Sequence, residues 1–432
     1  MPASLFVSGP IVSGSNVLLP PPGRQIDLSR QFIGFANASA AKANWTLARS
    51  KTIVAHKDCG HSSAERKIVS ISNAPARLVS PEPVPRPESV DGEWLEAMMH
   101  RAGYSVDIAG VSVQSIGTGQ IGDTARLTIT YRNGSVPGPD TLVGKFSSTD
   151  PTSLQVAAAW SLYEREVRFY DELATSARIT TPTYFGAQLD DAGDFALLLE
   201  DLAPAAPGDQ FKGLKPDQAV RAVQEAARLH AAFWDQGESA ALQWLDSGPL
   251  AQPFYAPDIF RSTWPGFFDR YHDQLTHEQR TVCDALAEGY DVYNAPRPRP
   301  RCVTHNDFRP DNMLLDDSRL FVVDWQSVAL GTNAVDIAYM VGGAFDSDAR
   351  QTVEPALLAA YHDELLRQGV TGYLRDELDA EYRHFTFAGI NVAVGAAMLV
   401  QRTERGDRMF LTMLDRHVSH VVDNDALSLL RT

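Results

Sequence analysis

The residues best suited to chemistry in this sequence lie in one short stretch. Residues 305–312 read HNDFRPDN, and a second aspartate, Asp324, ends an apolar run a little further along the chain. An Asp, an Asn five positions later and a second Asp form the pattern of a phosphoryl-transfer site. Asp307 could accept the proton of a substrate hydroxyl and orient that hydroxyl. Asn312 and Asp324 could hold Mg²⁺, which takes few protein oxygen ligands and fills its octahedron with water and phosphate oxygens.

A β-hairpin is expected to bring these two metal ligands together. Two short apolar runs flank a turn of Asp and Ser residues, which is typical of a hairpin. Pairing Leu315 with Leu320 places Asn312 opposite Val323, so Asn312 and Asp324 meet at the open end. A single Asp or Asn in a loop is usually a turn or cap residue. The combined pattern of residue types and contexts is much harder to obtain by chance.

A glycine-rich loop, GTGQIG, lies between two β-like runs over 106–116 and 125–131. Its Gly117, Gly119 and Gly122 form a G-x-G-x-x-G motif, which alone is a weak signal. A dinucleotide-binding fold needs a helix after the glycines. Here a second strand follows, which is typical of a flap that lays backbone N–H groups over nucleotide phosphates. An ordinary hairpin loop is the alternative.

An ion pair between Lys145 and Glu166 is predicted from their surroundings. Lys145 lies in the apolar run 142–146, where a lysine is more often a snorkelling edge residue. Glu166 lies on a helix expected over 153–173, with three aromatic residues at helical spacing around it. A carboxylate so enclosed is partly desolvated and needs a cation. We therefore expect Lys145 to bind Glu166 and to turn toward the α and β phosphates.

The remaining elements surround this site. The apolar run 195–199 breaks into Glu200, Asp201 and Leu202, and its backbone could serve as a hinge that bonds an adenine edge; any strand leaving a sheet looks the same locally. Helices are expected over the apolar stripe 94–99, from Pro216 to Trp234, over 335–340 and across much of 375–417. In the second of these helices, His230 is interpreted as a packed core residue.

Composition excludes several classes of protein. The 432 residues allow two or three domains, and 44% hydrophobic content supports a sizeable core. A net charge of -16 and a pI near 5.1 argue against nucleic-acid binding, which requires clustered Lys and Arg. Three scattered cysteines form neither a disulfide framework nor a zinc site and fit a reducing cytoplasm. No apolar run reaches the length of a membrane span. Nothing indicates the oligomeric state.

The first 87 residues are expected to be a disordered extension. They lack a sustained hydrophobic period, are rich in Ser and Ala, and end in the Pro-rich run PEPVPRP. The stretch before Pro85 carries more bases than acids, so an organelle transit peptide is one interpretation and a misassigned start codon is another. Folded sequence is expected from residue 88.

The chain resembles the aminoglycoside phosphotransferase and choline/ecdysteroid-kinase-like (CHK-like) branch of the protein-kinase-like fold, over roughly residues 90 to 420. The segments that carry the resemblance are the loop 117–122, Lys145, Glu166 within 165–170, the hinge 198–202, the helix end 229–234, the loop 305–312 and the pair Asp324-Trp325. The resemblance implies a two-lobed α+β fold that binds ATP and Mg²⁺ between the lobes. The N-lobe, an antiparallel sheet with one helix, would span 88–200, and the mainly helical C-lobe 201–432.

The resemblance also implies roles for single residues. Asp307 would be the catalytic base, Asn312 and Asp324 the metal ligands, and His305 a brace for the loop. Arg309 would stabilise charge on the transferring group, although a surface arginine fits its position nearly as well. The residues implied at the nucleotide are Gly117, Gly119, Gly122, Lys145, Glu166, Glu200 and Leu202.

Two departures from protein kinases favour a small-molecule acceptor. Trp325-Gln326 replaces the Phe-Gly that would follow the metal-binding aspartate. After Asp324, the stretch from Gly331 to Asp336 leads into a helix almost at once, which leaves no room for a long activation segment. Asp336 itself is interpreted as a structural residue that helps to hold the catalytic loop. The expected function is transfer of the γ-phosphoryl group of ATP to a hydroxyl of a small molecule. A catalytically silent, pseudokinase-like nucleotide-binding module is the alternative, and a protein kinase is less favoured.

The acceptor cannot be identified from residue patterns. An aromatic-rich stretch, 244–269, is the expected place for an apolar or ringed substrate, with core packing as the alternative. The negative charge of the folded part is compatible with a cationic acceptor such as an aminoglycoside or choline, although net charge does not locate a pocket.

Overall fold

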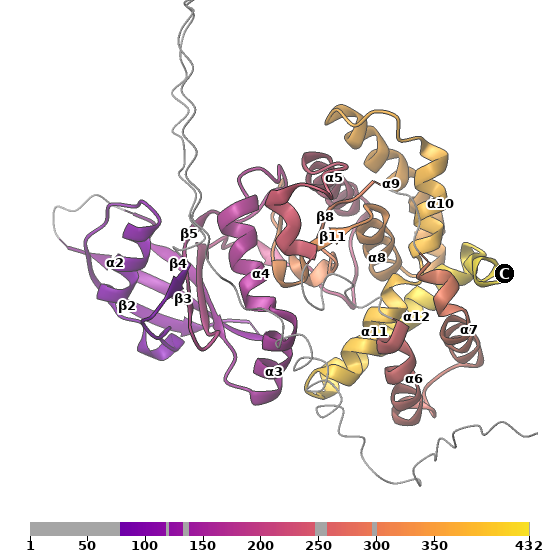
Figure 1. Cartoon of the computed structure of the whole chain (residues 1–432), viewed down its shortest axis with the longest axis horizontal. Helices are drawn as coiled ribbons and strands as arrows, with labels where there is room; N and C mark the ends of the chain where they lie inside the picture. The colour runs from indigo at the N-terminus through magenta and orange to yellow at the C-terminus, as the bar shows by residue number, and fades with distance from the viewer. Residues whose placement is uncertain (1–77, 118–120, 133–137, 247–256, 296–299, 432) are drawn as a thin grey trace, which may run out of the picture. The chain divides into compact units, whose positions relative to one another are not determined.

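The computed structural model (Figure 1) describes residues 78–117, 121–132, 138–246, 257–295 and 300–431. Gly119 of the glycine-rich loop lies outside the described residues, as does the expected extension up to residue 77. Among the described residues, no helix has both the length and the apolar character needed to cross a lipid bilayer.

An antiparallel sheet forms the N-terminal part of the described chain. Its strands are β1 (Val79–Ser80), β2 (Ile108–Ser115), β3 (Gly122–Tyr131), β4 (Thr141–Ser147), β5 (Tyr184–Asp190) and β6 (Phe195–Glu200). Their order is β1-β5-β6-β4-β3-β2, and every pairing is antiparallel except that between β1 and β5. The strands predicted over 106–116, 125–131, 142–146 and 195–199 are confirmed, whereas β1 and β5 were not predicted.

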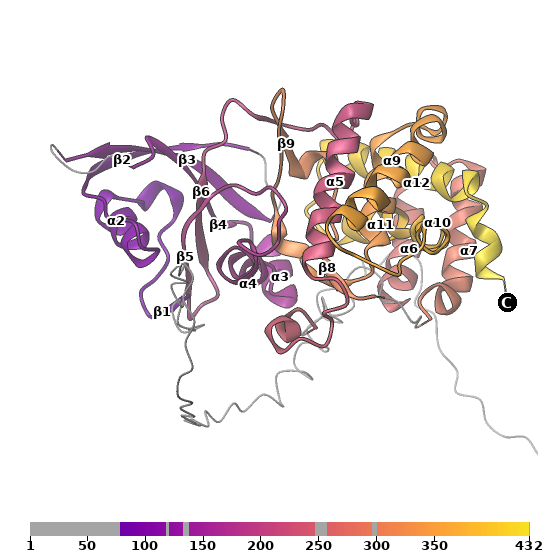
Figure 2. The same ribbon diagram turned by 90° about the horizontal axis from the view of Figure 1, so that it is seen from above.

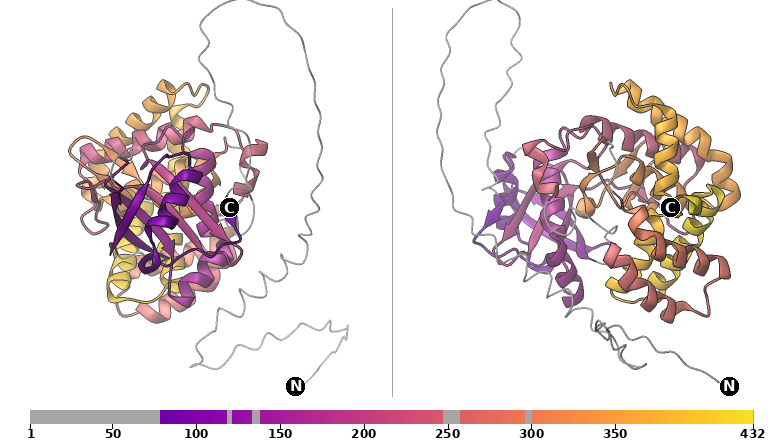
Figure 3. Two further views of the ribbon diagram at one scale, coloured as in Figure 1. Left: turned by 90° about the vertical axis from the view of Figure 1, so that its left-hand side faces the viewer. Right: turned by 45° about the vertical axis from the view of Figure 1, so that its right-hand side comes forward.

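Strand alternation divides this sheet into two faces. Helix α2 (Gly92–Arg101), capped by the side chain of Asp91, packs its buried Leu95, Met98 and Met99 on one face with Phe146 of β4 (Figure 3). Because successive side chains of a strand point to opposite faces, Lys145 of β4 points to the other face, which α4 covers. This alternation is what delivers a lysine to the helix that carries Glu166.

The segment 153–173 is helical, but the prediction of one continuous helix is wrong. The structure has α3 (Pro151–Trp160), α4 (Leu162–Arg168) and a π-helical turn η3 (Phe169–Leu173). Ser161 adopts the left-handed conformation with φ 52°, and its N–H bonds to the carbonyl groups of Ala157 and Ala158, which ends α3. The break at Ser161 comes before Glu166, and the π-helical turn η3 comes after it. π-Helical turns are frequent at functional sites.

Helices dominate the rest of the described chain (Figure 2). They are α5 (Pro216–Ala232), η4 (Ala240–Asp246), α6 (Pro257–Tyr271), α7 (His277–Tyr293), α8 (Ala334–Ala344), α9 (Ser347–Arg367), α10 (Arg375–Phe385), α11 (Ala388–Leu399), α12 (Glu404–Asp423) and η8 (Ala426–Leu430). The short strands among them are β7 (Ala206–Pro207), β8 (Cys302–Thr304), β9 (Met313–Leu315), β10 (Leu320–Val322) and β11 (Ala329–Gly331). The predicted antiparallel N-lobe and mainly helical C-lobe are confirmed.

Two expectations about particular segments need correction. Residues 78–87 are ordered although they were assigned to the disordered extension: Leu78 is buried, and its carbonyl accepts a hydrogen bond from Leu189 N (2.8 Å), which starts the β1–β5 pairing. In the stretch proposed for the acceptor, Phe260, Trp264 and Phe267 are buried in a hydrophobic core with α7 and α11. They therefore pack the C-lobe. Residues 247–256 of that stretch, with Phe254 and Tyr255, lie outside the described residues.

Candidate active site

The predicted hairpin is present with the predicted register. Strand β9 pairs with β10 so that Leu315 faces Leu320, and Val323 N donates to Asn312 O at 3.0 Å. The backbone of Asn312 is thus bonded to the residue before Asp324. The structure confirms that these two side chains start from the same end of the hairpin.

The loop before the hairpin is anchored by Asp336 at the start of α8. This fully buried carboxylate accepts hydrogen bonds from His305 N (2.7 Å) and Asn306 N (2.8 Å), and it contacts His230 Nε2 at 3.1 Å. The expectation that Asp336 holds the loop is confirmed, and so is the burial of His230. Asn306 adopts a left-handed conformation (φ 62°), which Asn tolerates better than most residues. Its side chain donates to Ser327 O at 3.0 Å.

His305 connects the loop to the second strand of the hairpin. Its Nε2 bonds to Val323 O at 3.0 Å, and its Nδ1 accepts from Asp307 N at 3.2 Å. Both bonds are satisfied by the neutral tautomer protonated on Nε2. The ring also packs against Trp325, with 4.6 Å between centroids. This is the bracing position that the resemblance implies.

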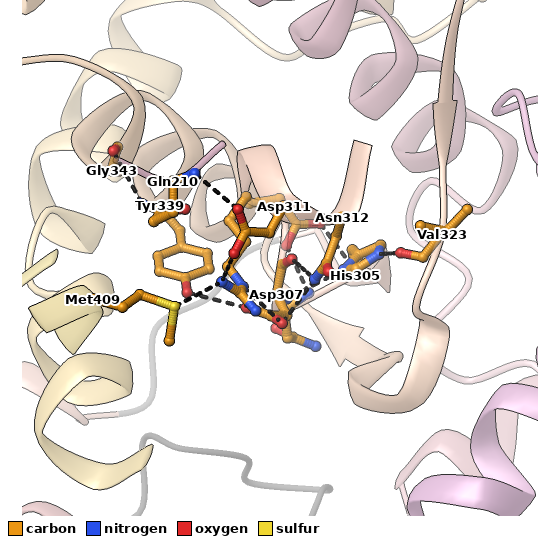
Figure 4. A network of polar contacts seen from close by, with 12 residues as sticks. Gln210, His305, Asp307, Asp311, Asn312, Val323, Tyr339, Gly343 and Met409 are labelled. Carbon is orange, nitrogen blue, oxygen red and sulfur yellow. Dashed lines mark hydrogen bonds and ion pairs between the residues drawn. The ribbon is translucent and has the colours of Figure 1, made fainter. Parts of the chain in front are cut away.

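Three donors surround the carboxylate of Asp307 (Figure 4). Tyr339 OH donates to Oδ1 at 3.1 Å, Asn312 Nδ2 donates to Oδ2 at 2.8 Å, and Arg309 Nε lies 3.0 Å from Oδ1. Tyr339 was not predicted. It follows Asp336 at i+3 on α8, a spacing that puts both residues on one face of the helix. Burial, then the charge of Asp307, raises the pKa of Tyr339 well above its usual value, so its hydroxyl remains a donor.

Arg309 bridges the two aspartates of the loop. Its Nη1 donates to Asp311 Oδ2 at 3.1 Å and approaches Met409 Sδ of α12 at 3.6 Å. Burial favours the neutral form of the guanidinium, but the charge of Asp307, its hydrogen bond and the charge of Asp311 together raise the pKa, so Arg309 remains a cation. The surface alternative considered for this residue does not fit, because it is largely enclosed by partners.

Lys145 forms the predicted ion pair and a second one that was not predicted. Its Nζ lies 2.6 Å from Glu166 Oε1 and 2.9 Å from Asp324 Oδ1. Glu166 is fully buried, and its other oxygen accepts from Gln326 Nε2 at 3.3 Å. Burial alone would lower the pKa of Lys145, but the charges of Asp324 and then Glu166 raise it. The ammonium group is therefore retained, and it connects the N-lobe sheet to the hairpin.

The oxygens of Asn312 and Asp324 suit a hard cation. Asn312 uses its amide nitrogen on Asp307, and within the described ranges its Oδ1 has no hydrogen-bond partner. Burial acts to raise the pKa of Asp324, but Lys145 outweighs this and lowers it, so the carboxylate is ionised. No group of three or more His, Cys, Asp or Glu that could hold a metal occurs among the described residues. Two oxygen donors suit Mg²⁺, which takes few protein ligands and completes its shell with water and phosphates.

The described ends of the glycine-rich loop agree with a flap between strands. Gly117 has φ +76°, and a Cβ at Gly122 would lie 2.8 Å from Phe146 O, so both positions restrict larger residues. Tyr163 of α4 donates to Ile121 O at 2.5 Å and holds the end of the loop. Strand β3 starts at Gly122, and the absence of a helix there removes the dinucleotide interpretation.

The expected hinge follows β6. Glu200 uses its carboxylate on Thr183, accepting from the backbone N at 3.0 Å and from Oγ1 at 2.7 Å. The carbonyl of Leu202 accepts from Ala205 N at 2.8 Å. The side chain of Glu200 therefore shapes the turn, and any contact of this segment with an adenine edge must use the remaining backbone groups.

Comparison with known proteins agrees with this geometry. A sequence model described as "Phosphotransferase enzyme family" matches residues 140–375, more than half of the chain. The chain therefore belongs to this family, and the family and enzyme class predicted from the sequence, a small-molecule kinase, are confirmed. No curated protein matches the sequence.

Several solved structures are similar to the chain at low identity. A putative aminoglycoside phosphotransferase from Ralstonia eutropha JMP134 is 17% identical and has a TM-score of 0.47; the match covers 77% of this chain and 98% of that one. Choline kinase from Cryptosporidium parvum Iowa II is 9% identical, with a TM-score of 0.49 and coverage of 73% and 89%. The GDP complex of aminoglycoside 2'-phosphotransferase-IIIa is 13% identical, with a TM-score of 0.44 and coverage of 76% and 98%.

Proposed function

We propose that the protein transfers the γ-phosphoryl group of ATP to a hydroxyl of a small molecule, with Mg²⁺ as cofactor. The observation that carries the proposal is the junction of Asp307, Asn312 and Asp324 at one end of the hairpin, with Lys145 of the sheet bonded to Asp324. Family membership supports phosphotransfer. The nucleotide, the metal and the acceptor are inferred from the chemistry of these side chains.

Each residue has a distinct task in this proposal. The acceptor hydroxyl gives its proton to Asp307 as its oxygen forms a bond to the γ-phosphorus, and the bond from phosphorus to the β–γ bridging oxygen breaks to release ADP. Asn312 and Asp324 hold Mg²⁺, which neutralises phosphate charge when it is bound. Lys145, kept in place by Glu166, contacts the nucleotide phosphates. Most of the acceleration comes from positioning and charge neutralisation.

A small acceptor is favoured by the short connection after Asp324. The turn η7 (Trp325–Ser327) and β11 lead directly to α8, which begins at Ala334. Protein kinases need a longer segment there to hold a peptide. The ring of Trp325, the first residue of this connection, stacks on Phe169 with 3.6 Å between centroids. Phosphorylation of a broad peptide library would restore the protein-kinase alternative.

Replacement of the base tests the proposal. In Asp307→Asn we expect kcat for ADP release with an accepted hydroxyl compound to fall by roughly 10²–10⁴-fold, while calorimetry shows MgATP binding largely intact. Asp324→Ala should instead weaken the Mg²⁺-dependent part of nucleotide binding. The matched control is Asp316→Asn in the turn of the hairpin, which should leave both properties unchanged.

Three outcomes separate the proposal from its alternatives. Near-normal turnover by Asp307→Asn contradicts the assignment of the base. The catalytically silent module is favoured if the wild-type protein binds MgATP but turns over no acceptor or peptide, and if Asp307→Asn binds MgATP equally well. Failure of the wild-type protein to bind MgATP contradicts the nucleotide site itself.

A further inference from the structure

Two arginines at the start of α12 lie beside the proposed catalytic loop. Arg405 Nη2 is 3.9 Å from Asp311 Oδ2, and the same carboxylate oxygen is bonded to Arg309 Nη1 at 3.1 Å. Arg309 Nε in turn lies 3.0 Å from Asp307. In Figure 4, Asp307 lies between Met409 of α12 and Val323, the residue before Asp324. The proposed base therefore lies between α12 and the end of the hairpin where the nucleotide and its metal are proposed to bind.

Phe211 forms a fixed platform for both guanidinium groups. The Cζ atom of Arg408 lies 4.4 Å from the centroid of its ring, and that of Arg405 lies 5.7 Å away. The buried side chain of Arg416 holds this backbone, donating to Phe211 O at 2.9 Å and to Gln210 O at 2.7 Å. Stacking on an aromatic ring orients a guanidinium without neutralising its charge.

Of the two guanidinium groups, only that of Arg405 approaches a carboxylate among the described residues, and that carboxylate is shared. Asp311 is shared with Arg309 and also accepts from Gln210 N at 2.8 Å. Arg408 has no ion-pair partner in the part of the chain that the structure describes. The first turn of α12 also carries Glu404 and Asp407, and Asp407 is paired with Arg402. Arg405 and Arg408 are both exposed, so an anion from solvent can reach the two guanidinium groups.

We infer that the acceptor carries an anionic group, a carboxylate or a phosphate, which Arg405 and Arg408 bind while its hydroxyl reaches Asp307. The inference rests on the proposed function and specifies its substrate class. The reaction converts a hydroxylated anion and ATP into a phosphate ester and ADP, and the hydroxyl proton passes to Asp307. This class differs from the cationic acceptors that the net charge of the chain suggests, because the two guanidinium groups on the Phe211 ring have no carboxylate of their own: Arg405 shares Asp311 with Arg309.

ADP release by the full-length enzyme with MgATP tests this inference on matched compounds. One arm contains hydroxycarboxylates with their neutral amides, a second contains sugar phosphates with the free sugars, and a third contains choline and aminoglycosides. We expect turnover of the anionic members of the first or second arm, which identifies the anion. In Arg405→Gln and Arg408→Gln the KM of that acceptor should rise about tenfold, since a charge-assisted hydrogen bond is lost; kcat and the KM of ATP should not change.

Arg402→Gln is the matched control. Arg402 precedes the same helix but is paired with Asp407 at 2.8 Å, so its loss should leave every KM unchanged. Three results overturn the inference and leave the proposed function standing: equal turnover of neutral or cationic partners, unchanged acceptor KM in both glutamine variants, or an enzyme that binds MgATP but neither binds nor phosphorylates any anionic compound. Absence of MgATP binding would overturn the proposed function as well.

Discussion

Three side chains hold the carboxylate of Asp307, the proposed base. Tyr339, Arg309 and Asn312 bond its two oxygens, and the first of these comes from α8. A carboxylate with both oxygens engaged has one orientation, which suits a group that must aim a hydroxyl. Tyr339 is therefore a positioning residue for the proposed reaction. Its contact is tertiary, so the sequence marked it only by its spacing from Asp336.

Tyr339→Phe isolates this positioning role, because it removes one hydroxyl and keeps the ring. We expect kcat to fall roughly tenfold, the equivalent of one hydrogen bond to a charged group, while the KM of ATP is unchanged. Steady-state kinetics of ADP release measures both. The control is Tyr290→Phe, which removes the buried hydroxyl that joins α7 to α11 through Asn391 Oδ1 at 2.7 Å. Equal losses in the two variants would show that the effect is structural.

Asp336 joins α8 to the proposed catalytic loop, residues 305–312. Its carboxylate satisfies the backbone N–H groups of His305 and Asn306, which are both buried. In Asp336→Ala these donors lose their partner, and we expect the free energy of unfolding to fall by about 3–5 kcal/mol. Urea denaturation measures the change. Asp348→Ala, on the exposed side of α9, should change it by less than about 0.5 kcal/mol; similar values for both variants would contradict the anchoring role.

Elements with a strong local pattern were predictable from the sequence, and those fixed by tertiary contacts were not. The hairpin register follows from two apolar runs and a turn, and the pairing of Leu315 with Leu320 is confirmed. The left-handed Ser161 that divides α3 from α4 has no local sequence signal. The two-residue strand β1 exists only because it pairs with β5.

The same division holds for the site. Asp307, Asn312 and Asp324 were visible as a spaced motif, and Lys145–Glu166 as a cation and a buried carboxylate. The hydrogen bond from Gln326 to Glu166 was not predicted, because it joins residues 160 positions apart. For the aromatic stretch 244–269 both an acceptor site and core packing were left open, and core packing holds for Phe260, Trp264 and Phe267. Apolar side chains on a helix form core as readily as a pocket, so the sequence pattern could not decide.

Two buried histidines of α12, His417 and His420, make the stability of the protein depend on pH. Burial lowers the pKa of His417 well below its usual value and also lowers that of His420. The unfolded chain binds protons at both positions below about pH 6.5, whereas the folded chain binds them only at lower pH. The stabilising contribution is therefore complete above that pH and is lost as the pH falls toward the lower folded pKa values.

Urea denaturation at a series of pH values measures this loss. We expect the free energy of unfolding to fall between about pH 6.5 and 5, by at most about 1.4 kcal/mol per pH unit for each histidine. His272→Gln serves as the control, because His272 is exposed and its replacement should leave the slope unchanged. A free energy of unfolding that stays constant over this range would contradict the burial of neutral imidazoles.

The position of the metal decides whether the two lobes build one phosphoryl-transfer site. Anomalous diffraction from crystals grown with Mn²⁺ and a non-hydrolysable ATP analogue locates that metal without knowledge of the acceptor. We predict a peak at about 2.0–2.2 Å from Asn312 Oδ1 and from a carboxylate oxygen of Asp324, with Lys145 Nζ turned from Asp324 to a phosphate. A bound nucleotide whose metal lies away from both residues would contradict this account.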